Sequence, residues 1–446
     1  MRYARTAIAL PILCSAGLAI WLVTFVRFGP FGYGYDSGLY RRYLLEPFVS
    51  FPNTPVPGLD HTVFLPRILL DLVHFFVRNP DVALYGTYLG LGIAGVISVY
   101  FFTKHYTGNR GAVAATLLYI LSAVQFSAQQ AFFFKQAAAL PLFLFGVLAF
   151  ETRRYALGAC LGILIVLTHQ TSSVLYIVLA GTGFLTRAFF TRSIPLAYAF
   201  SVTAVAAAYL LLHPHVAQKV ASPPVSLFIS PSEYLLWSVP LFAFVVLGVR
   251  SFLPVAKRNH VLLGSLGILL LFVILRLPFY SRVYVFLDLL LAVPAAYGAL
   301  VAYGWFRVRA RSLAPLAGAV LVIAAAFPMF WLQKHSEASI SPDIQETVRT
   351  LSALPKGSAV VTSPALLPWA HGWSIVEVHA PGIFKEPHAT EEWNRYWSHA
   401  EPQFERAFLA SFPQPAYILA RPVEGDYVPE CARELRPFLY DVDTCL

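Results

Sequence analysis

The segment FGPFGYGYDSGLYRRYLLEP, residues 28–47, follows directly on a stretch of about twenty apolar residues. It contains closely spaced glycines, which let a chain turn tightly or approach another molecule closely. It also contains several tyrosines, one carboxylate at Asp36 and two adjacent arginines, Arg41 and Arg42. Such an Asp is either a turn residue that binds its own backbone or a reactive group. The rest of the chain is needed to decide between these two interpretations.

The composition is that of a membrane protein. Hydrophobic residues make up 58% of the 446 residues and charged residues 12%, and the mean hydropathy is +0.64. These values lie outside the range of soluble globular domains. They predict a polytopic α-helical membrane protein with about eleven transmembrane helices. The apolar stretches are 7–26, 81–103, 111–128, 136–150, 155–168, 171–186, 194–212, 234–250, 260–275, 283–306 and 313–332.

Basic residues are distributed unevenly between the connecting segments. If residue 1 is cytoplasmic, the segments on that side hold fourteen Lys and Arg and a single acid, Glu151. Cytoplasmic loops of membrane proteins collect Lys and Arg, so the net charge of +9 indicates topology rather than nucleic-acid binding. We expect a multi-pass protein of the cell (plasma) membrane with a cytoplasmic N-terminus. The tips of two hairpins, at 129–136 and 168–170, are polar and would lie on the opposite side.

Two regions are expected outside the cytoplasm. Residues 29–80 form a first outer loop with two short amphipathic stretches, 36–49 and 65–77, that predict helices lying in the interface. From residue 333 charges become frequent: a helix should begin at 341–343 and another cover 390–411, with strands within 358–363, 373–379 and 415–421. We expect a transmembrane domain at 1–332 and an extracytoplasmic α/β domain at 333–446.

Cysteines and glycines carry two further signals. Cys431 and Cys445 both lie in the C-terminal region expected outside, where oxidation is permitted, so they are a possible disulfide, with two free thiols as the alternative. The run Gly90-x-Gly92-x-x-Gly95 matches a dinucleotide-binding fingerprint but lies inside an apolar span without a preceding strand. We interpret these glycines as sites of close helix packing.

Arginines near the late spans suggest the chemistry. Arg276 and Arg282 flank a short turn on the outer side, against the charge bias of that face. Guanidinium groups bind phosphate oxygens in a bidentate manner, although an Arg at the end of a span also anchors its helix. An enzyme with its loops outside needs an activated substrate that arrives through the lipid, and polyprenyl-phosphate sugars meet that need. Asp288 lies about 9 Å deeper, and we expect it to pair with one of these arginines.

The layout of the whole chain resembles the GT-C superfamily of integral-membrane glycosyltransferases, which use lipid-phosphate sugars. GYDSGLYRRYL (34–44) looks like the acidic motif of that family's first outer loop. RLPFYSR (276–282) is similar to the late outer loop whose arginines contact the donor phosphate, and VLTHQTS (166–172) looks like a hairpin tip facing the active-site cavity. Two features depart from relatives: Ser37 stands where many have a second acid, and the W-W-D-Y-G signature of oligosaccharyltransferases is absent.

The resemblance implies transfer of one hexosyl or pentosyl group from a polyprenyl-phosphate donor to an acceptor hydroxyl, with inversion. Asp36 would act as general base, and Arg276, Arg282 and Lys135 would bind the donor phosphate. No cofactor is expected with certainty: a divalent metal is not favoured, because such an ion generally needs more than one carboxylate. The residues expected to contact substrate are Tyr35, Tyr40, Arg41, His169 and Gln170.

Other function classes stay open at this stage. A glycan polymerase or ligase acting on lipid-linked oligosaccharide would share the lipid substrate, and a lipid or solute transporter would share the membrane domain. Transporters commonly contain repeated halves, and the sequence shows no internal repeat. The expected partners are the lipid-linked donor, the bilayer and an acceptor that is a glycan, lipid or protein, and they do not include nucleic acid.

Overall fold

The computed structural model describes residues 2–34, 36–45, 64–213, 228–277, 280–309, 312, 314–381, 388–398, 401–422 and 425–446. Its contacts divide the chain into two compact units. The first, called here the helical unit, comprises Met1–Thr24, His61–Pro66 and Tyr88–Ser336. The second, the loop–tail unit, comprises Phe25–Asp60, Arg67–Thr87 and Glu337–Leu446, so it joins most of the first loop with the C-terminal residues.

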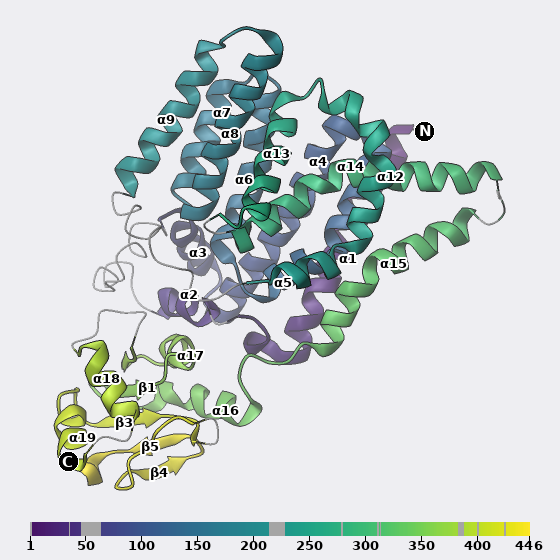
Figure 1. The fold of residues 1–446 in the computed structure, drawn as a ribbon. Coiled ribbons are helices and arrows are strands. Elements are labelled where there is room, and N and C mark those ends of the chain that lie inside the picture. The colour runs from purple at the N-terminus through teal and green to yellow at the C-terminus, as the bar shows by residue number, and fades with distance from the viewer. Residues whose placement is uncertain are drawn as a thin grey trace. The chain divides into compact units, whose positions relative to one another are not determined.

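The helical unit is a bundle of apolar helices (Figure 1). Seven helices in the described part of the chain are long and apolar enough to cross a membrane, and α7, α9 and α13 are shorter apolar helices. The prediction of a polytopic helical membrane protein is confirmed. The helices are α1 (Arg2–Phe28), α4 (Pro80–Ile120), α5 (Ala123–Gln130), α6 (Phe134–Glu151), α7 (Tyr155–Val166), α8 (Gln170–Thr191), α9 (Leu196–Leu212), α11 (Pro231–Trp237), α12 (Val239–Ala256), α13 (His260–Ile274), α14 (Tyr280–Arg309) and α15 (Ala314–His335).

One predicted span has a wrong boundary. The stretch 81–103 and the first part of the stretch 111–128 fall in α4, which is interrupted at Gly108, where φ is 71°. The second part of α4 ends at Ile120 rather than at residue 128. The Ser122 side chain accepts a hydrogen bond from the Gln125 backbone N–H and thereby caps the separate helix α5. A count of apolar residues alone does not detect this cap.

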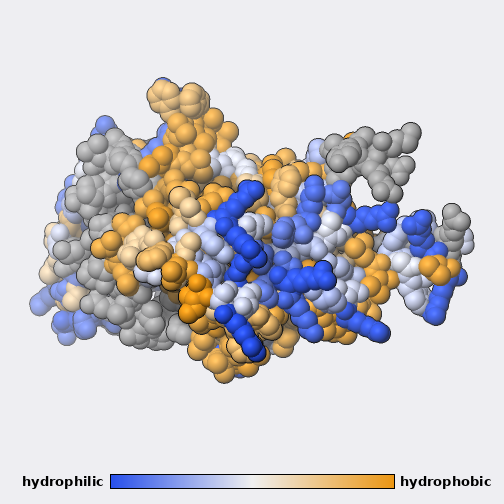
Figure 2. All heavy atoms as spheres, turned by 90° about the horizontal axis from the view of Figure 1, so that it is seen from above, coloured by the Kyte–Doolittle hydropathy of each residue, from blue (hydrophilic) through white to orange (hydrophobic). Residues whose placement is uncertain are grey.

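Helix α14 is the most enclosed of the long helices. Of the residues in its most apolar 18-residue stretch, 72% are buried, whereas 11% are buried in the corresponding stretch of α15. Glycines let α12 approach it closely: a Cβ added at Gly298 would lie 1.8 Å from the backbone oxygen of Phe244. Seen from above, the surface shows hydrophobic residues on its flanks and hydrophilic side chains gathered in its middle (Figure 2). This pattern fits a bundle that exposes apolar sides to lipid.

The glycines of the 90–95 run pack against aromatic rings. A Cβ at Gly92 would lie 2.7 Å from the Trp21 ring, and one at Gly95 would lie 2.7 Å from the Tyr119 hydroxyl, whereas Gly90 has nothing within 4 Å. Two of the three glycines therefore allow close packing, and all three lie within α4.

The loop–tail unit contains a five-stranded sheet in the order β2-β1-β3-β5-β4. The first three strands are parallel, and β5 runs antiparallel to both β3 and β4. Strands are thus present in all three segments where they were predicted. The strands are β1 (Ala359–Thr362), β2 (Glu377–His379), β3 (Ala416–Leu419), β4 (Arg433–Arg436) and β5 (Leu439–Asp441).

The helices of this unit come from several parts of the sequence. They are α2 (Asp36–Leu45) from the first loop, α16 (Pro342–Thr350), α17 (Leu367–Trp373), α18 (Thr390–Trp397) and α19 (Pro402–Ala410), while α3 (Phe64–Phe76) contributes residues from Arg67 onward. The single helix predicted at 390–411 is wrong: Pro402, at the first position of α19, begins a new helix. A disulfide joins Cys431 to Cys445 across a separation of 14 residues.

Candidate active site

Three candidate side chains come together in the helical unit. Lys135 lies in the first turn of α6, Arg282 in the first turn of α14, and His169 directly before α8. Burial lowers the pKa of His169 well below its ordinary value, and the positive charges of Arg282 and Lys135 lower the pKa further. His169 is therefore neutral near pH 7, and its Nδ1 lies 2.7 Å from the Ser172 hydroxyl. We call these three residues the cation cluster.

The turn between α5 and α6 presents this part of the site. Helix α5 ends in a Schellman motif: the Phe132 N–H donates to the Gln129 oxygen and the Phe133 N–H to the Ala128 oxygen. Phe132 takes the left-handed conformation there, with φ of 57°, which costs a non-glycine residue about 1–2 kcal/mol. Its ring is fully buried, with its centroid 4.2 Å from that of Tyr88. Packing offsets the backbone strain and fixes the turn.

Arg282 is held in a defined orientation by an aromatic ring. The central guanidinium carbon lies 3.4 Å from the centroid of Phe133 and 6.0 Å from that of Phe228. Stacking on Phe133 is a cation–π contact that aligns the planar guanidinium. The N–H bonds of a guanidinium lie in its plane, so it is through its edges that this group can donate to phosphate oxygens.

Arg276 takes a different position from the cation cluster. It is exposed and follows α13 in a second Schellman motif, in which its N–H donates to Val273 and the Leu277 N–H to Phe272. Its φ is 49°, in a position that glycine usually occupies. Among the described residues, the cations that lower the pKa of His169 are Arg282 and Lys135, and Arg276 is not one of them. The phosphate-binding role of Arg276 stays a prediction.

The other predicted site residues lie in the loop–tail unit or beside the cluster. Asp36 opens α2, where the helix N-terminus favours a carboxylate. Tyr40 is buried, with its ring centroid 5.9 Å from that of Tyr43. Gln170 is the first residue of α8, next to His169, and Tyr35 lies outside the described residues. The substrate contacts of these residues stay predictions.

Arg41 makes a dense set of contacts within the loop–tail unit. Its Nε donates to Asp81 at 2.7 Å and its Nη1 to the Gly372 carbonyl oxygen at 2.6 Å. Its guanidinium carbon also lies 4.5 Å from the centroid of the Trp373 ring. These contacts tie α2 to the start of α4 and to α17, so Arg41 supports the helix that begins with Asp36. Its predicted contact with substrate stays a prediction.

Gly38 lets α2 and α17 touch through their backbones. A Cβ at Gly38 would lie 2.0 Å from the Pro368 oxygen. We predict that Gly38→Ala displaces α2, which carries Asp36, and lowers the free energy of unfolding by about 1–3 kcal/mol. The melting temperature and the activity should both decrease. Gly86→Ala is the control, because nothing lies within 4 Å of its added Cβ; equal effects of the two variants would contradict the packing argument.

His371 in α17 makes the stability of the loop–tail unit depend on pH. Burial, and to a smaller extent the nearby positive charge of Arg42, lower its pKa to about 3. The unfolded chain takes up this proton near pH 6.5, so stability should fall as the pH decreases from about 6.5 toward 3. We expect His371→Gln to flatten the decline of melting temperature in this range, whereas the same change at the exposed His335 should not. An unchanged slope in His371→Gln would refute the assignment.

The prediction of an ion pair at Asp288 is wrong. Its Oδ2 accepts hydrogen bonds from the Ser122 hydroxyl at 2.8 Å and the Gln125 amide at 3.2 Å. No arginine pairs with it among the residues that the structure describes. The start of α5 brings neutral donors to the carboxylate. This arrangement was not predicted, because the span predicted at 111–128 did not separate α5 from α4. Asp288 therefore ties α14 to α5.

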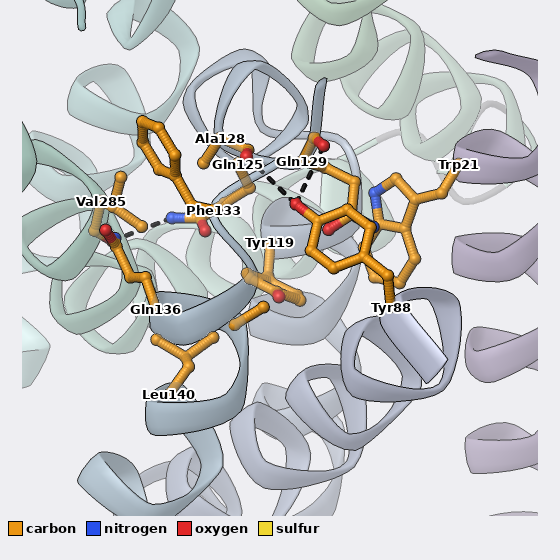
Figure 3. Close-up of a pocket in the computed structure, with 11 residues that line it drawn as sticks. Trp21, Tyr88, Tyr119, Gln125, Ala128, Gln129, Phe133, Gln136, Leu140 and Val285 are labelled. Atoms are coloured by element: carbon orange, nitrogen blue, oxygen red, sulfur yellow. Dashed lines mark hydrogen bonds between the residues drawn. The ribbon is translucent and has the colours of Figure 1, made fainter. Parts of the chain in front are cut away.

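A small pocket lies beside the cation cluster (Figure 3). Its volume is about 30 Å³. Phe133, on which the Arg282 guanidinium stacks, is part of its wall. The lining residues are Trp21, Tyr88, Tyr119, Gln125, Ala128, Gln129, Phe133, Gln136, Ala137, Leu140 and Val285. The polar hairpin tip at 129–136 thus contributes both to this pocket and, through Lys135, to the cation cluster.

The described side chains offer little to a metal ion. Within these residues there is no group of three or more His, Cys, Asp or Glu that could hold one.

The fold is similar to that of solved GT-C glycosyltransferases, which confirms the expected GT-C-like fold. No protein-family model and no curated protein sequence matches the chain. The oligosaccharyltransferase of Archaeoglobus fulgidus in its apo form gives a TM-score of 0.65 at 13% identity, covering 93% of this chain and 69% of that one. The same enzyme tethered to an acceptor peptide gives a TM-score of 0.62 at 14% identity, and the match covers 93% of this chain and 68% of that one.

A second kind of solved structure matches over nearly equal lengths. ArnT from Cupriavidus metallidurans, bound to undecaprenyl phosphate, gives a TM-score of 0.53 at 13% identity and covers 96% of this chain and 97% of that one. At such identities the likeness shows the fold alone.

Proposed function

We propose that this protein is a membrane glycosyltransferase that moves one sugar from a polyprenyl-phosphate donor to an acceptor hydroxyl on the extracytoplasmic face, with inversion. The observation that carries the proposal is the cation cluster, in which the positive charges of Arg282 and Lys135 act on the buried His169. Support also comes from the fold, which this chain shares over nearly its full length with a protein solved with undecaprenyl phosphate.

The cation cluster would bind the donor phosphate. Arg282, aligned by its stacking on Phe133, supplies two parallel N–H donors to phosphate oxygens. Lys135 adds a second positive charge. His169 is neutral, so it can donate a hydrogen bond to the phosphate or to a sugar hydroxyl without a change of charge. During transfer, negative charge grows on the departing phosphate, and fixed positive groups stabilise this charge most effectively.

Asp36 would be the general base. The acceptor oxygen forms a bond with the anomeric carbon as the bond from that carbon to the phosphate oxygen breaks, and the phosphate leaves with the electron pair. The acceptor proton passes to the Asp36 carboxylate. Polyprenyl phosphate has a second pKa near 6, so it can leave without a proton donor. Asp36 belongs to the loop–tail unit. That its carboxylate comes close to the bound donor and acceptor is part of the proposal.

Transfer of a larger glycan is the second candidate. The likeness to the oligosaccharyltransferase, with a TM-score of 0.65, favours this possibility. Against it, the chain lacks the W-W-D-Y-G sequence expected of that class and covers only 69% of the oligosaccharyltransferase chain.

The test is mass spectrometry of membrane glycolipids and glycoproteins from cells with and without the gene. A product that lacks one hexose or pentose in the deletion strain is the expected result. Accumulation of a complete, unpolymerised lipid-linked unit would instead identify a polymerase or ligase. A transporter would alter the side of the membrane on which a glycolipid lies without changing its mass, and this outcome would refute the proposal.

A further inference from the structure

The pocket of Figure 3 contains polar groups without partners. Gln136 is 4% exposed, and neither its Nε2 nor its Oε1 has a hydrogen-bond partner among the described residues. Gln129 is 8% exposed, and its Nε2 also lacks a partner there. A buried amide that makes no hydrogen bond costs about 1–3 kcal/mol. The pocket therefore requires a ligand or ordered water that supplies both hydrogen-bond donors and acceptors.

The two glutamines face the pocket from different sides. In Figure 3, Gln136 lies beside Val285, and Gln129 lies toward Tyr88 and Trp21. The third glutamine is already engaged, since the Gln125 Nε2 donates to the Val285 oxygen at 2.9 Å and to Asp288 at 3.2 Å. Gln129 itself is held in place through its backbone oxygen, which accepts from the Tyr88 hydroxyl at 2.9 Å. The backbone of Gln129 is fixed while its side-chain amide remains available.

The chemistry of the lining selects a neutral group with hydroxyls. A hydroxyl both donates and accepts, so it can satisfy either end of the Gln136 amide and the Gln129 donor. The lining residues include no carboxylate that could pair with an ammonium group, and the Asp288 carboxylate already accepts hydrogen bonds from Ser122 and Gln125. A volume of about 30 Å³ holds one or two water-sized groups. This space fits the hydroxyl-bearing edge of a sugar rather than a whole ring.

The pocket and the cation cluster adjoin each other. Phe133 lines the pocket, and its ring carries the Arg282 guanidinium at 3.4 Å from the centroid. Gln136 follows Lys135 in the first turn of α6. Because Phe133 borders both, a ligand whose phosphate is bound by Arg282 would have its neighbouring atoms near the pocket. In a polyprenyl-phosphate sugar those atoms belong to the sugar, which is bonded directly to the phosphate.

We propose that the pocket around Gln129 and Gln136 reads the donor sugar and selects a neutral hexose over an amino sugar or a bare lipid phosphate. This inference rests on the proposed function, because it assumes that the cation cluster binds the donor phosphate. The glutamine amides bond hydroxyl groups at the edge of the sugar. Without a donor, water fills the pocket.

The experiment measures binding to the full chain in lipid nanodiscs. The probes are undecaprenyl phosphate, undecaprenyl-phosphate glucose and undecaprenyl-phosphate glucosamine, which differs from the glucose probe in the amine alone. We expect the wild-type protein to bind the glucose probe about tenfold more tightly than undecaprenyl phosphate, as one or two added hydrogen bonds allow. The amino sugar should gain no such preference.

Variants separate the pocket from the cation cluster. Gln136→Met and Gln129→Met keep side-chain volume but remove the amide, and each should reduce the glucose preference roughly three- to tenfold with unchanged affinity for undecaprenyl phosphate. Gln130→Met is the control, because the Gln130 amide donates to Ser336 at 2.6 Å. The unchanged affinity for the bare lipid phosphate also reports that each variant is folded.

The outcomes are distinct. If wild type shows no preference for glucose, or if both Met variants retain it, the pocket holds water only and this inference is overturned while the proposed function stands. If wild type does not bind undecaprenyl phosphate at all, the proposed function fails instead.

Discussion

Asp36→Asn is expected to lower kcat for sugar transfer by about 10²–10⁴-fold, the usual contribution of a general base. The amide has nearly the same shape as the carboxylate but cannot accept the acceptor's proton. Asp36 also lies in the first turn of α2, where loss of the negative charge costs only about 0.3–1 kcal/mol. The variant should therefore fold and bind undecaprenyl phosphate like the wild-type protein. Single-turnover transfer with a labelled donor measures the rate directly.

Asp71→Asn is the matched control for this experiment. Asp71 lies in α3, also in the loop–tail unit, and pairs with Arg67 at 3.8 Å. It is partly exposed and has no proposed role in proton transfer, so its amide variant should transfer sugar within about twofold of the wild-type rate. If Asp36→Asn retained the wild-type rate, Asp36 would be a helix-terminal residue only and the base would have to be another group.

Hydropathy alone predicted most of the helical unit. Apolar runs identify membrane helices because lipid contact imposes one requirement over about twenty residues. The same reasoning failed at residue 120, because a single serine side chain decides where α4 ends and α5 begins. The partner of Asp288 was predicted wrongly for the same reason, because its donors Ser122 and Gln125 lie at the start of α5, 166 and 163 positions away in the sequence. Local patterns cannot predict such distant partners.

The candidate site was predictable to a different degree for each residue. Lys135, His169 and Arg282 were all named from the sequence, and the structure brings these three together. Nothing in the sequence, however, indicated that Phe133 would orient Arg282 or that Gln136 would be buried without a partner. The environment of Arg41 was missed for the same reason, since its partner Gly372 lies 331 positions away. Residue type suggests chemistry, but tertiary packing decides which groups are available for it.

The contacts of α2 show how far local signals extend. Glycines at the start of this helix suggested close approach to a substrate, whereas Gly38 is in backbone contact with Pro368 of α17. One glycine of the motif thus has a structural role that the sequence alone could not distinguish from a functional one. Helix α17 itself was absent from the prediction, because its seven residues are too few to show a helical period.

Arg282→Ala should weaken the binding of undecaprenyl phosphate by about 10²-fold, because charge-assisted hydrogen bonds contribute roughly 1.5–3 kcal/mol each. Arg282→Lys keeps the positive charge but loses both the planar fork and the stacking on Phe133, so it should restore the affinity only in part, to about tenfold below wild type. Affinities measured in nanodiscs at low and high salt would test this order, and the difference between variants should shrink as salt screens the charges.

Arg309→Ala provides the control on the same helix. Arg309 lies at the other end of α14 and its guanidinium carbon is 4.9 Å from the centroid of the Trp305 ring, so it makes the same kind of contact as Arg282 without a place in the cation cluster. Its loss should leave lipid-phosphate affinity unchanged. If both alanine variants weakened binding equally, the effect would come from the overall positive charge of the protein rather than from a phosphate site. If Arg282→Ala bound like wild type, the donor phosphate would have to be bound elsewhere, and the cation cluster could no longer support a glycosyltransferase mechanism.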